Sequence, residues 1–378
     1  MPVVLRNARV LGPGGWHDGG IAIDAGRIMA LLPPGERGPH GAREIDLGGR
    51  LILPGFVDTQ VNGGGGVLFN DEPTREGIRA IGRAHAAFGT TAFLPTLISD
   101  HPAVIERACL AVDAAIADEE PGVAGIHVEG PVLAGARAGI HDPSRLRGLD
   151  GDLLDILCRP RRGVTLVTLA PERVLPADLD RLRAAGVVLS AGHSAATASE
   201  VETALRHGLS GFTHLYNAMT PTTAREPGVV GAALADDGSY CGIIVDGRHV
   251  DPRVLRLALR TKRHDRFMLV TDAMPVAGTD LGAFTLQGRT ITVEADACVD
   301  ATGRLAGTVL TMAAAVRNAM RLLGLPLESA ARMASEYPAR FLGLATAHGV
   351  LAPGARADLV ITDPAVGSLE TWIGGRPV

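Results

Sequence analysis

The sequence is poor in aromatic residues and has almost no lysine. Only 3% of its 378 residues are aromatic while 46% are hydrophobic, so a core must be built mainly from aliphatic side chains. Lys262 is the single lysine, and arginine carries the remaining basic charge. The net charge is −5, with no long run of one sign. This argues against a general nucleic-acid or acidic-membrane binder, because such binding needs a basic surface.

Cysteine is scarce, and long hydrophobic runs are missing. The cysteines form no Cys-x-x-Cys pair and sit in or near apolar segments, which predicts buried free thiols rather than disulfides or a zinc cluster. They are Cys109, Cys158, Cys241 and Cys298. The N-terminal MPVVLRNARV lacks the basic start and apolar core of a secretion signal, and no apolar run reaches membrane-spanning length. We therefore expect a soluble cytoplasmic protein.

Residues 54–345 alternate between strand-like and helix-like patterns. Helical spacing is clearest where Ile105, Ala108, Cys109 and Val112 recur on one face. Eight apolar segments predict strands: Phe56–Val61, Thr91–Thr96, Val123–Val128, Val164–Leu169, Val187–Ala191, Gly211–Leu215, Tyr240–Val245 and Arg266–Val270. This alternation predicts an α/β fold, a (β/α)8 TIM-like barrel. No Gly-x-Gly-x-x-Gly follows the first strand, which disfavours an open dinucleotide-binding sheet.

The two ends of the chain have a different pattern. Residues 1–53 and 346–378 consist of short strand-like segments and turns without a helical period, so we expect them to form one small β-sandwich module. Within the barrel region, the pattern of Gly282–Arg304 predicts a hairpin-like excursion, which interrupts the alternation of strands and helices. Helical segments follow at Thr308–Leu323 and Leu327–Gly343.

Polar residues gather where the predicted barrel strands end, which is where barrel enzymes place their chemistry. They are Asp58, Gln60, Asn62, His127, Glu129, His193, His214, Asn217, Asp246, His249 and Asp272. A single histidine after an apolar strand is more often a hydrogen-bonded packing residue than a ligand. Glu129 is different, because a carboxylate that ends a fully apolar strand is costly to bury without a partner.

Three of these residues form a recognisable ligand set if the barrel is correct. Glu129, His193 and His214 on one rim are the His2Glu combination of a catalytic zinc site that leaves one position open for water. Asp272 follows the last strand, which closes the barrel next to the first, so we expect its carboxylate to face that position. The sequence therefore predicts a metal-dependent hydrolytic site.

Nine motifs, in order along nearly the whole chain, resemble the amidohydrolase superfamily and, more narrowly, the N-acetylglucosamine-6-phosphate deacetylase family. The motifs around the strand ends are PGFVDTQVNG, HVEGPVL, SAGHSAA, FTHLYNAM and LVTDAMPVAG. The others are GTTAFLPTLIS, AGIHDP, LAGTVLTM and YPARFLGL. The resemblance implies hydrolysis of the N-acetyl group of N-acetylglucosamine 6-phosphate to glucosamine 6-phosphate and acetate, in amino-sugar metabolism.

The resemblance also bears on the number of metal ions. Many amidohydrolases carry His-x-His at the end of the first strand and hold a second metal there, whereas this chain has Gln60 and Asn62. Carboxamides are poor ligands beside imidazole. We therefore expect one divalent ion per subunit, zinc first, although His2Glu also accepts Fe, Co or Mn. Gln60 and Asn62 are expected to hydrogen-bond water or the ligands, the alternative being that they cap the strand. Asp58 is expected to be structural.

Further roles are implied only by the resemblance. Asp272 would act as general base and then acid, and His141 would polarise the acetyl oxygen. Arg225, His249, Asn217 and Ala218 would bind the phosphate. The family forms dimers, so Arg225 or His249 would act within its own subunit or across the interface of a homodimer. The plainer alternatives are a solvent-facing His141 and an ordinary surface Arg225.

The role of His127 and the choice among rival functions stay open. His127 has three possible roles: orienting Glu129, reaching the substrate or simple packing. Within the enzyme class, the rival is another amidohydrolase, such as a cyclic amidase or aminohydrolase, although these commonly keep His-x-His. Outside it, the rival is a non-catalytic sugar-phosphate sensor on an inherited barrel. A sensor needs no base beside a metal site, which disfavours that reading.

Overall fold

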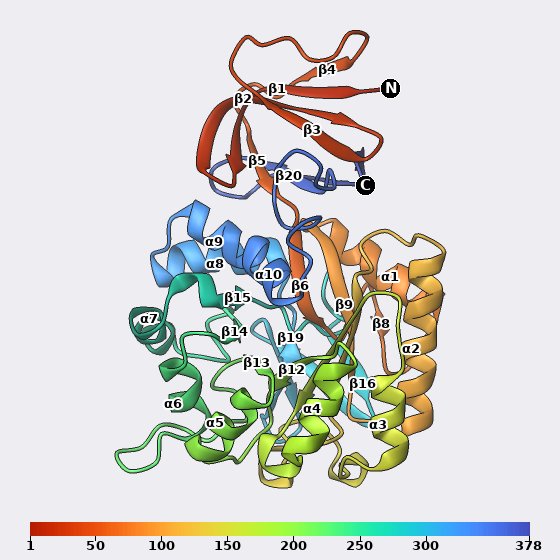
Figure 1. The fold of residues 1–378 in the computed structure, drawn as a ribbon, viewed down its shortest axis with the longest axis vertical. Helices are drawn as coiled ribbons and strands as arrows, with labels where there is room; N and C mark the ends of the chain where they lie inside the picture. The colour runs from red at the N-terminus through yellow and green to blue at the C-terminus, as the bar shows by residue number, and fades with distance from the viewer.

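The computed structural model describes all 378 residues and contains the predicted barrel. Eight parallel strands follow one another in the order β15-β14-β13-β12-β11-β10-β9-β6 (Figure 1). Their bounds are β6 Phe56–Val61, β9 Thr90–Ile98, β10 Gly125–Glu129, β11 Val164–Leu169, β12 Val188–Ala191, β13 Leu209–Phe212, β14 Tyr240–Ile243 and β15 Phe267–Leu269. Backbone bonds from Asp272 N to Gln60 O (3.0 Å) and from Asn62 N to Ala273 O (2.9 Å) join the last strand region to the first.

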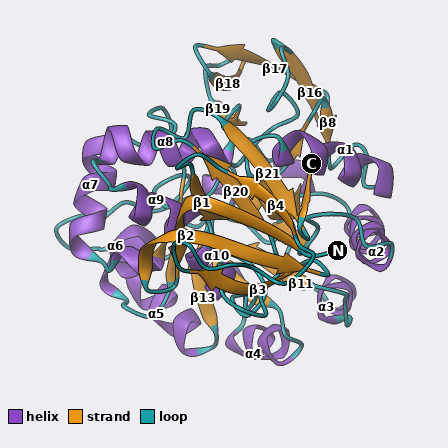
Figure 2. Cartoon of the chain, turned by 90° about the horizontal axis from the view of Figure 1, so that it is seen from above, coloured by secondary structure: helices purple, strands orange, loops and turns teal.

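Helices cover the outside of the barrel (Figure 2). They are α1 Arg75–Ala86, α2 Pro102–Ala117, α3 Gly151–Cys158, α4 Pro176–Ala184, α5 Ala198–Arg206, α6 Gly228–Ala235, α7 Pro252–Thr261, α8 Met312–Leu323, α9 Leu327–Ala334 and α10 Glu336–Phe341. Every residue of β6 and β9 is buried, as expected for parallel strands packed on both faces. Local signals fix helix ends: Thr197 and Glu200 form a capping box before α5.

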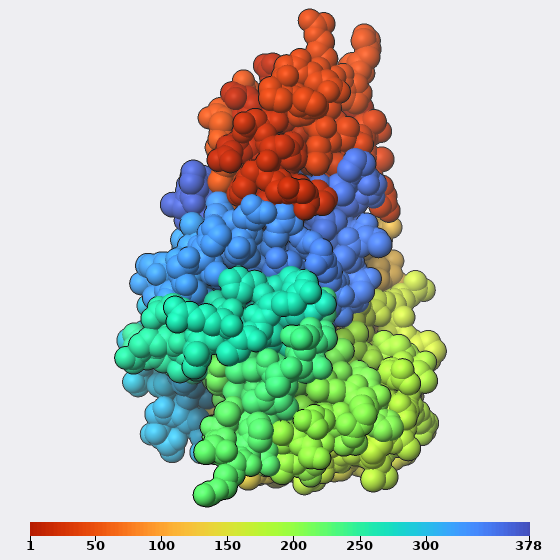
Figure 3. Space-filling view, turned by 60° about the vertical axis from the view of Figure 1, so that its left-hand side comes forward, coloured from red at the N-terminus to blue at the C-terminus, as the bar shows by residue number.

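Both ends of the chain contribute to one further sheet of eight strands. It contains β1 Val3–Gly12, β2 Gly15–Asp24, β3 Arg27–Leu32, β4 Arg43–Asp46, β5 Leu51–Pro54, β20 Leu359–Thr362, β21 Leu369–Ile373 and β22 Arg376–Pro377. This module has its own hydrophobic cluster and lies at one end of the barrel (Figures 1 and 3). Only Gly55 separates β5 from β6, and a Cβ there would lie 2.1 Å from Thr91 Oγ1.

The predicted hairpin excursion is a four-stranded antiparallel sheet. Its strands are β16 Ala283–Leu286, β17 Arg289–Glu294, β18 Ala297–Asp300 and β19 Leu305–Thr308, paired in that order. Its buried side chains pack with Ile98 and Met274 at the carboxyl-terminal end of the barrel. The excursion therefore lies on the same rim as the polar residues that follow the strands.

The scarce residues, cysteine and lysine, are mostly buried. All four cysteines are free, and Cys158 differs from the others in being only half-buried. Lys262, just after α7, is 4% exposed. Its ammonium donates hydrogen bonds to the carbonyl groups of Ala233 and Asp236 and to the Ser239 hydroxyl. No helix is both long and apolar enough to cross a membrane.

Candidate active site

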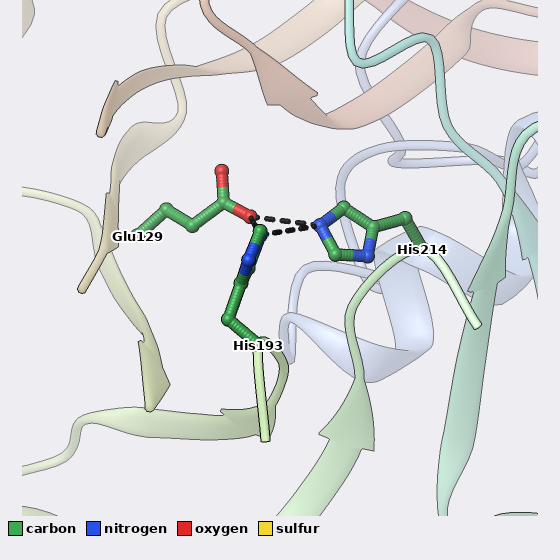
Figure 4. Close-up of side chains that lie close together, drawn as sticks. All are labelled: Glu129, His193 and His214. Atoms are coloured by element: carbon green, nitrogen blue, oxygen red, sulfur yellow. Dashed lines mark hydrogen bonds and ion pairs between the residues drawn. The ribbon is translucent and has the colours of Figure 1, made fainter. Parts of the chain in front are cut away.

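Glu129, His193 and His214 converge at the carboxyl ends of three barrel strands (Figure 4). Glu129 is the last residue of β10, and each histidine follows its strand by two residues. His214 Nε2 lies 2.9 Å and His193 Nε2 lies 3.2 Å from Glu129 Oε1, while the two nitrogens are 3.1 Å apart. Ligand atoms about 2.1 Å from a tetrahedral zinc ion are about 3.4 Å apart, so the triangle is close to the size that a zinc ion needs.

The protonation of the site also suits a cation. His193 Nδ1 lies 2.9 Å from the carbonyl oxygen of Arg137, which only accepts hydrogen bonds, so in the neutral ring the proton sits on Nδ1 and Nε2 presents a lone pair. A hydrogen bond of this kind, made by the ring nitrogen that does not face the metal, usually orients a metal-binding histidine. Burial alone would raise the pKa of Glu129, but its close contacts with the His193 and His214 rings outweigh burial and hold the pKa well below its usual value. When both rings are neutral, two ring nitrogens and one carboxylate oxygen meet at one point, which fits a divalent ion.

Asp272 adjoins this triangle through two side-chain amides. Its Oδ1 accepts hydrogen bonds from Asn62 Nδ2 (2.7 Å) and Gln60 Nε2 (3.1 Å). Gln60 Nε2 also lies 3.2 Å from Glu129 Oε2 and so bridges the two carboxylates. Burial, and then the nearby Glu129 charge, raise the pKa of Asp272 to about 6. Gln60 and Asn62 are hydrogen-bonded to the site, which favours the predicted outer role over a mere strand cap.

Several residues of the rim have a backbone conformation that is unusual for residues other than glycine. Positive φ angles occur at His193 (49°), His214 (34°), Ala218 (51°) and Asp272 (51°). Such conformations cost free energy and persist where the surrounding structure enforces them, often at functional sites. At His193, His214 and Asp272 this conformation occurs two or three residues after a barrel strand, where the side chain enters the site.

Asp58 and His127 point into the barrel and do not line the pocket. Asp58 accepts a hydrogen bond from Thr271 Oγ1 (2.6 Å) and bonds from the backbone N–H groups of Thr271 and Gln60. It therefore fastens the first strand to the segment before Asp272, as expected for a structural residue. His127 bonds to Thr59 O and Thr168 Oγ1, and burial lowers its pKa to about 4. These contacts favour packing over substrate contact.

The triangle lies at the bottom of an open pocket of about 650 Å3. His141 is buried in its wall, with its ring centroid 4.4 Å from that of His193. Its Nδ1 accepts a bond from Ser99 N (3.3 Å) and lies 2.8 Å from Ser99 Oγ, so in the neutral ring Nε2 carries the proton. Burial, and then the neighbouring His193, lower the pKa of His141 to about 3, which keeps the ring neutral. His141 is therefore a hydrogen-bond donor in the wall, not a solvent-facing loop residue.

The residues expected to bind phosphate are only partly together. Asn217, Ala218 and His249 line the pocket, and His249 Nδ1 is held by Asp246 Oδ2 at 2.6 Å. Arg225 does not line the pocket; it is exposed on the loop before α6, which projects from the barrel (Figures 1 and 3). Its predicted role thus requires movement of this loop or a second subunit.

Sequence reasoning missed three arginines in the pocket wall. Arg137 comes from the loop after β10, whereas Arg289 and Arg304 come from the β16–β19 excursion. None of the three lies directly at the end of a barrel strand, where the sequence analysis looked for polar residues. The hairpin pattern of the excursion was visible, but its packing over the rim was not.

Comparisons with known proteins agree with this architecture. Residues 51–378 match the Amidohydrolase family. The chain belongs to the amidohydrolase family. The chain is 46% identical over 325 residues to an N-acetylgalactosamine-6-phosphate deacetylase of Shewanella sp. (strain ANA-3), covering 86% of this chain and 82% of that protein. It is 35% identical to the human N-acetylglucosamine-6-phosphate deacetylase, covering 99% and 93% of the two chains.

Solved structures show the same similarity over the full length of this amidohydrolase. The crystal structure of N-acetylglucosamine-6-phosphate deacetylase from Pasteurella multocida superposes with a TM-score of 0.96 at 33% identity, covering 100% of both chains. The corresponding enzyme from Thermotoga maritima gives a TM-score of 0.89 at 27% identity, with 99% of each chain covered. The predicted fold class and the predicted enzyme family are both confirmed.

Proposed function

We propose that this amidohydrolase removes the acetyl group from an N-acetylhexosamine 6-phosphate, with N-acetylglucosamine 6-phosphate as the expected substrate. The products would be glucosamine 6-phosphate and acetate, in amino-sugar catabolism or recycling. The observation that carries the proposal is the placement of Asp272 beside the Glu129, His193 and His214 triangle, with Gln60 bonded to both carboxylates. The similarity to deacetylases over nearly the whole chain supports it.

Each residue would have one task. A divalent ion held by Glu129, His193 and His214, zinc first with Fe, Co or Mn as alternatives, would lower the pKa of water and polarise the acetyl carbonyl. Asp272 would accept the proton of the attacking water and return it to the departing nitrogen, because it is an acceptor with a pKa of about 6. His141 would donate from Nε2 to the acetyl oxygen as negative charge develops there.

The phosphate end of the substrate would bind away from the triangle. His249, Asn217 and Ala218 line the pocket and would contact the phosphate there, Ala218 through its backbone N–H. Arg225 would close over the phosphate from its exposed loop, in its own subunit or in the partner subunit of a homodimer. A guanidinium suits this role because its planar fork binds two phosphate oxygens at once.

N-acetylgalactosamine 6-phosphate is a second candidate substrate. The 46% identity to an N-acetylgalactosamine-6-phosphate deacetylase exceeds the 35% identity to the human glucosamine-type enzyme. The two sugars carry the same acetamide and phosphate groups and differ only in the orientation of one hydroxyl. The metal triangle and Asp272 would act on either of them.

Acetate release tests the proposal. Purified protein of known metal content would be assayed with both phosphorylated sugars, with the unphosphorylated sugars and with a cyclic amide. We expect turnover of at least one phosphorylated sugar and none of the cyclic amide. Bound metal without acetate release from any acetylated amino sugar would overturn the proposal and favour the sensor reading.

Arg225→Ala tests the phosphate assignment. We expect a larger rise of KM for the phosphorylated sugar than for the unphosphorylated one, because only the former meets the guanidinium. Arg83, an arginine in the last turn of α1 that does not line the pocket, offers a matched control as Arg83→Ala. Equal losses on both substrates would count against the assignment.

A further inference from the structure

Two arginines of the β16–β19 excursion reach the pocket from the same end of their sheet. In an antiparallel meander, alternate turns lie at the same end, so the β16–β17 and β18–β19 turns are neighbours. Arg289 directly follows the first turn and Arg304 ends the second. Both side chains line the pocket that also contains the metal triangle.

Both guanidinium groups are anchored but not neutralised. Arg304 Nη1 donates to Gly139 O at 2.8 Å, and Arg289 Nη2 donates to the carbonyl of the next residue, Ile140. Neither arginine forms a salt bridge, although most ion pairs of this protein use arginine, as in Arg145 with Asp100. A guanidinium has five N–H donors, so each of these groups keeps further donors and a full positive charge at the pocket wall.

The anchored loop adjoins the groups already proposed to hold the phosphate. A Cβ on Gly139 would lie 3.1 Å from the His193 ring and 4.0 Å from Ala218 Cβ. Arg304 is thus joined through Gly139 to the stretch that would offer the Ala218 N–H group. Two fixed cations beside this stretch form the kind of site that binds a dianion.

We propose that Arg289 and Arg304 are substrate-binding residues that recognise the phosphate group from within the same subunit. This inference rests on the proposed function, and it extends the phosphate site beyond Arg225 and His249. The arginines would pair with phosphate oxygens while keeping their bonds to Gly139 and Ile140. The loop that leads directly into His141 would then be fixed in place when a phosphorylated sugar is bound.

Two substitutions with a matched control test the inference. Arg289→Gln and Arg304→Gln keep a polar side chain but remove the charge. Arg256 is a suitable control because it also donates to a single backbone carbonyl, Leu322 O at 2.6 Å, forms no salt bridge and lies outside the pocket. Thermal unfolding would first establish that all variants are folded.

The expected readout is a selective loss of phosphate recognition. Loss of a charge-assisted bond should raise KM for the phosphorylated sugar about tenfold or more, with KM for the unphosphorylated sugar within about twofold of wild type. Arg256→Gln should change neither value. Equal loss of kcat on both substrates would show that the arginines only hold the His141 loop, and would overturn the inference.

A binding measurement separates this inference from the deacetylase proposal. Calorimetric titration with inorganic phosphate should give a Kd that weakens about tenfold in either variant but not in Arg256→Gln. This comparison decides the role of the arginines even when wild-type protein releases no acetate, a result that would overturn the proposed function alone. Unchanged phosphate affinity in both variants would overturn the inference.

Discussion

Asp272→Asn is the most direct test of how the site moves protons. The Oδ1 atom of Asp272 accepts bonds from Asn62 at 2.7 Å and from Gln60 at 3.1 Å. Asparagine has the same shape and keeps an acceptor oxygen in that position, so the surrounding amides retain their partners. The variant loses only the ability to take up a proton. A loss of activity would therefore reflect proton transfer and not a change in the structure of the site.

The size of the effect follows from this geometry. A positioned general base contributes about 10²- to 10⁴-fold to the rate, so kcat should fall at least about a hundredfold. That factor corresponds to about 3 kcal/mol in the activation barrier. Because Glu129 and burial raise the pKa of Asp272 to about 6, removal of its charge relieves repulsion. We therefore expect the unfolding temperature of the variant to equal or exceed that of wild type.

The assay combines three measurements on one preparation. Elemental analysis should find the same metal content as in wild type, acetate release should fall, and thermal unfolding should show a folded protein. Asp251→Asn is the matched control, since Asp251 caps α7 at the surface and lies outside the pocket. Turnover of Asp272→Asn within tenfold of wild type would refute the role of Asp272 as base, and loss of metal would instead make it a ligand.

Two further predictions concern the metal and the barrel interior. Metal titration should saturate at one ion per subunit, because Gln60 and Asn62 use their amide N–H groups on Asp272; two tightly held ions would contradict this. The second prediction concerns Asp58. Burial raises the pKa of its carboxyl group from 3.8 to about 7. Between about pH 4 and 7 the folded protein therefore holds a proton that the unfolded chain has released. The free energy of unfolding of wild type should therefore fall as pH rises through this window, relative to Asp58→Asn, by up to about 4 kcal/mol. Denaturant unfolding of both proteins at about pH 5 and pH 8 should capture about 3 kcal/mol of this change. A stability difference between the two proteins that stays the same at both pH values would exclude a raised pKa of Asp58.

The metal triangle was predictable because its residues lie at or just beyond the ends of mainly apolar strands. Glu129 ends β10 and His193 and His214 follow β12 and β13, so the barrel rule alone brings them to one rim. Arg289 and Arg304 lie far from any barrel strand end in the sequence. Their place in the pocket depends on how the excursion packs over the rim, and no local pattern encodes that packing.

Helices were predictable where one face is apolar and the other polar. The spacing of Ile105, Ala108, Cys109 and Val112 predicted α2. Three helices escaped this reasoning. The sequence GVVGAALA of α6 is apolar on every side, α3 spans only eight residues, and PADLDRLRA of α4 has two buried leucines among charges. Periodicity is weak in such segments, and tertiary packing decides their structure.

Because Lys262 is buried, cleavage of the chain after this residue can be used to measure unfolding. A lysine-specific protease has a single target in the chain, and in the folded state that side chain is 4% exposed and occupied by three acceptors. Native protein should resist the enzyme, whereas each molecule that opens around α7 is cut once, into residues 1–262 and 263–378. The rate at which those two fragments accumulate would count opening events without any label or substitution.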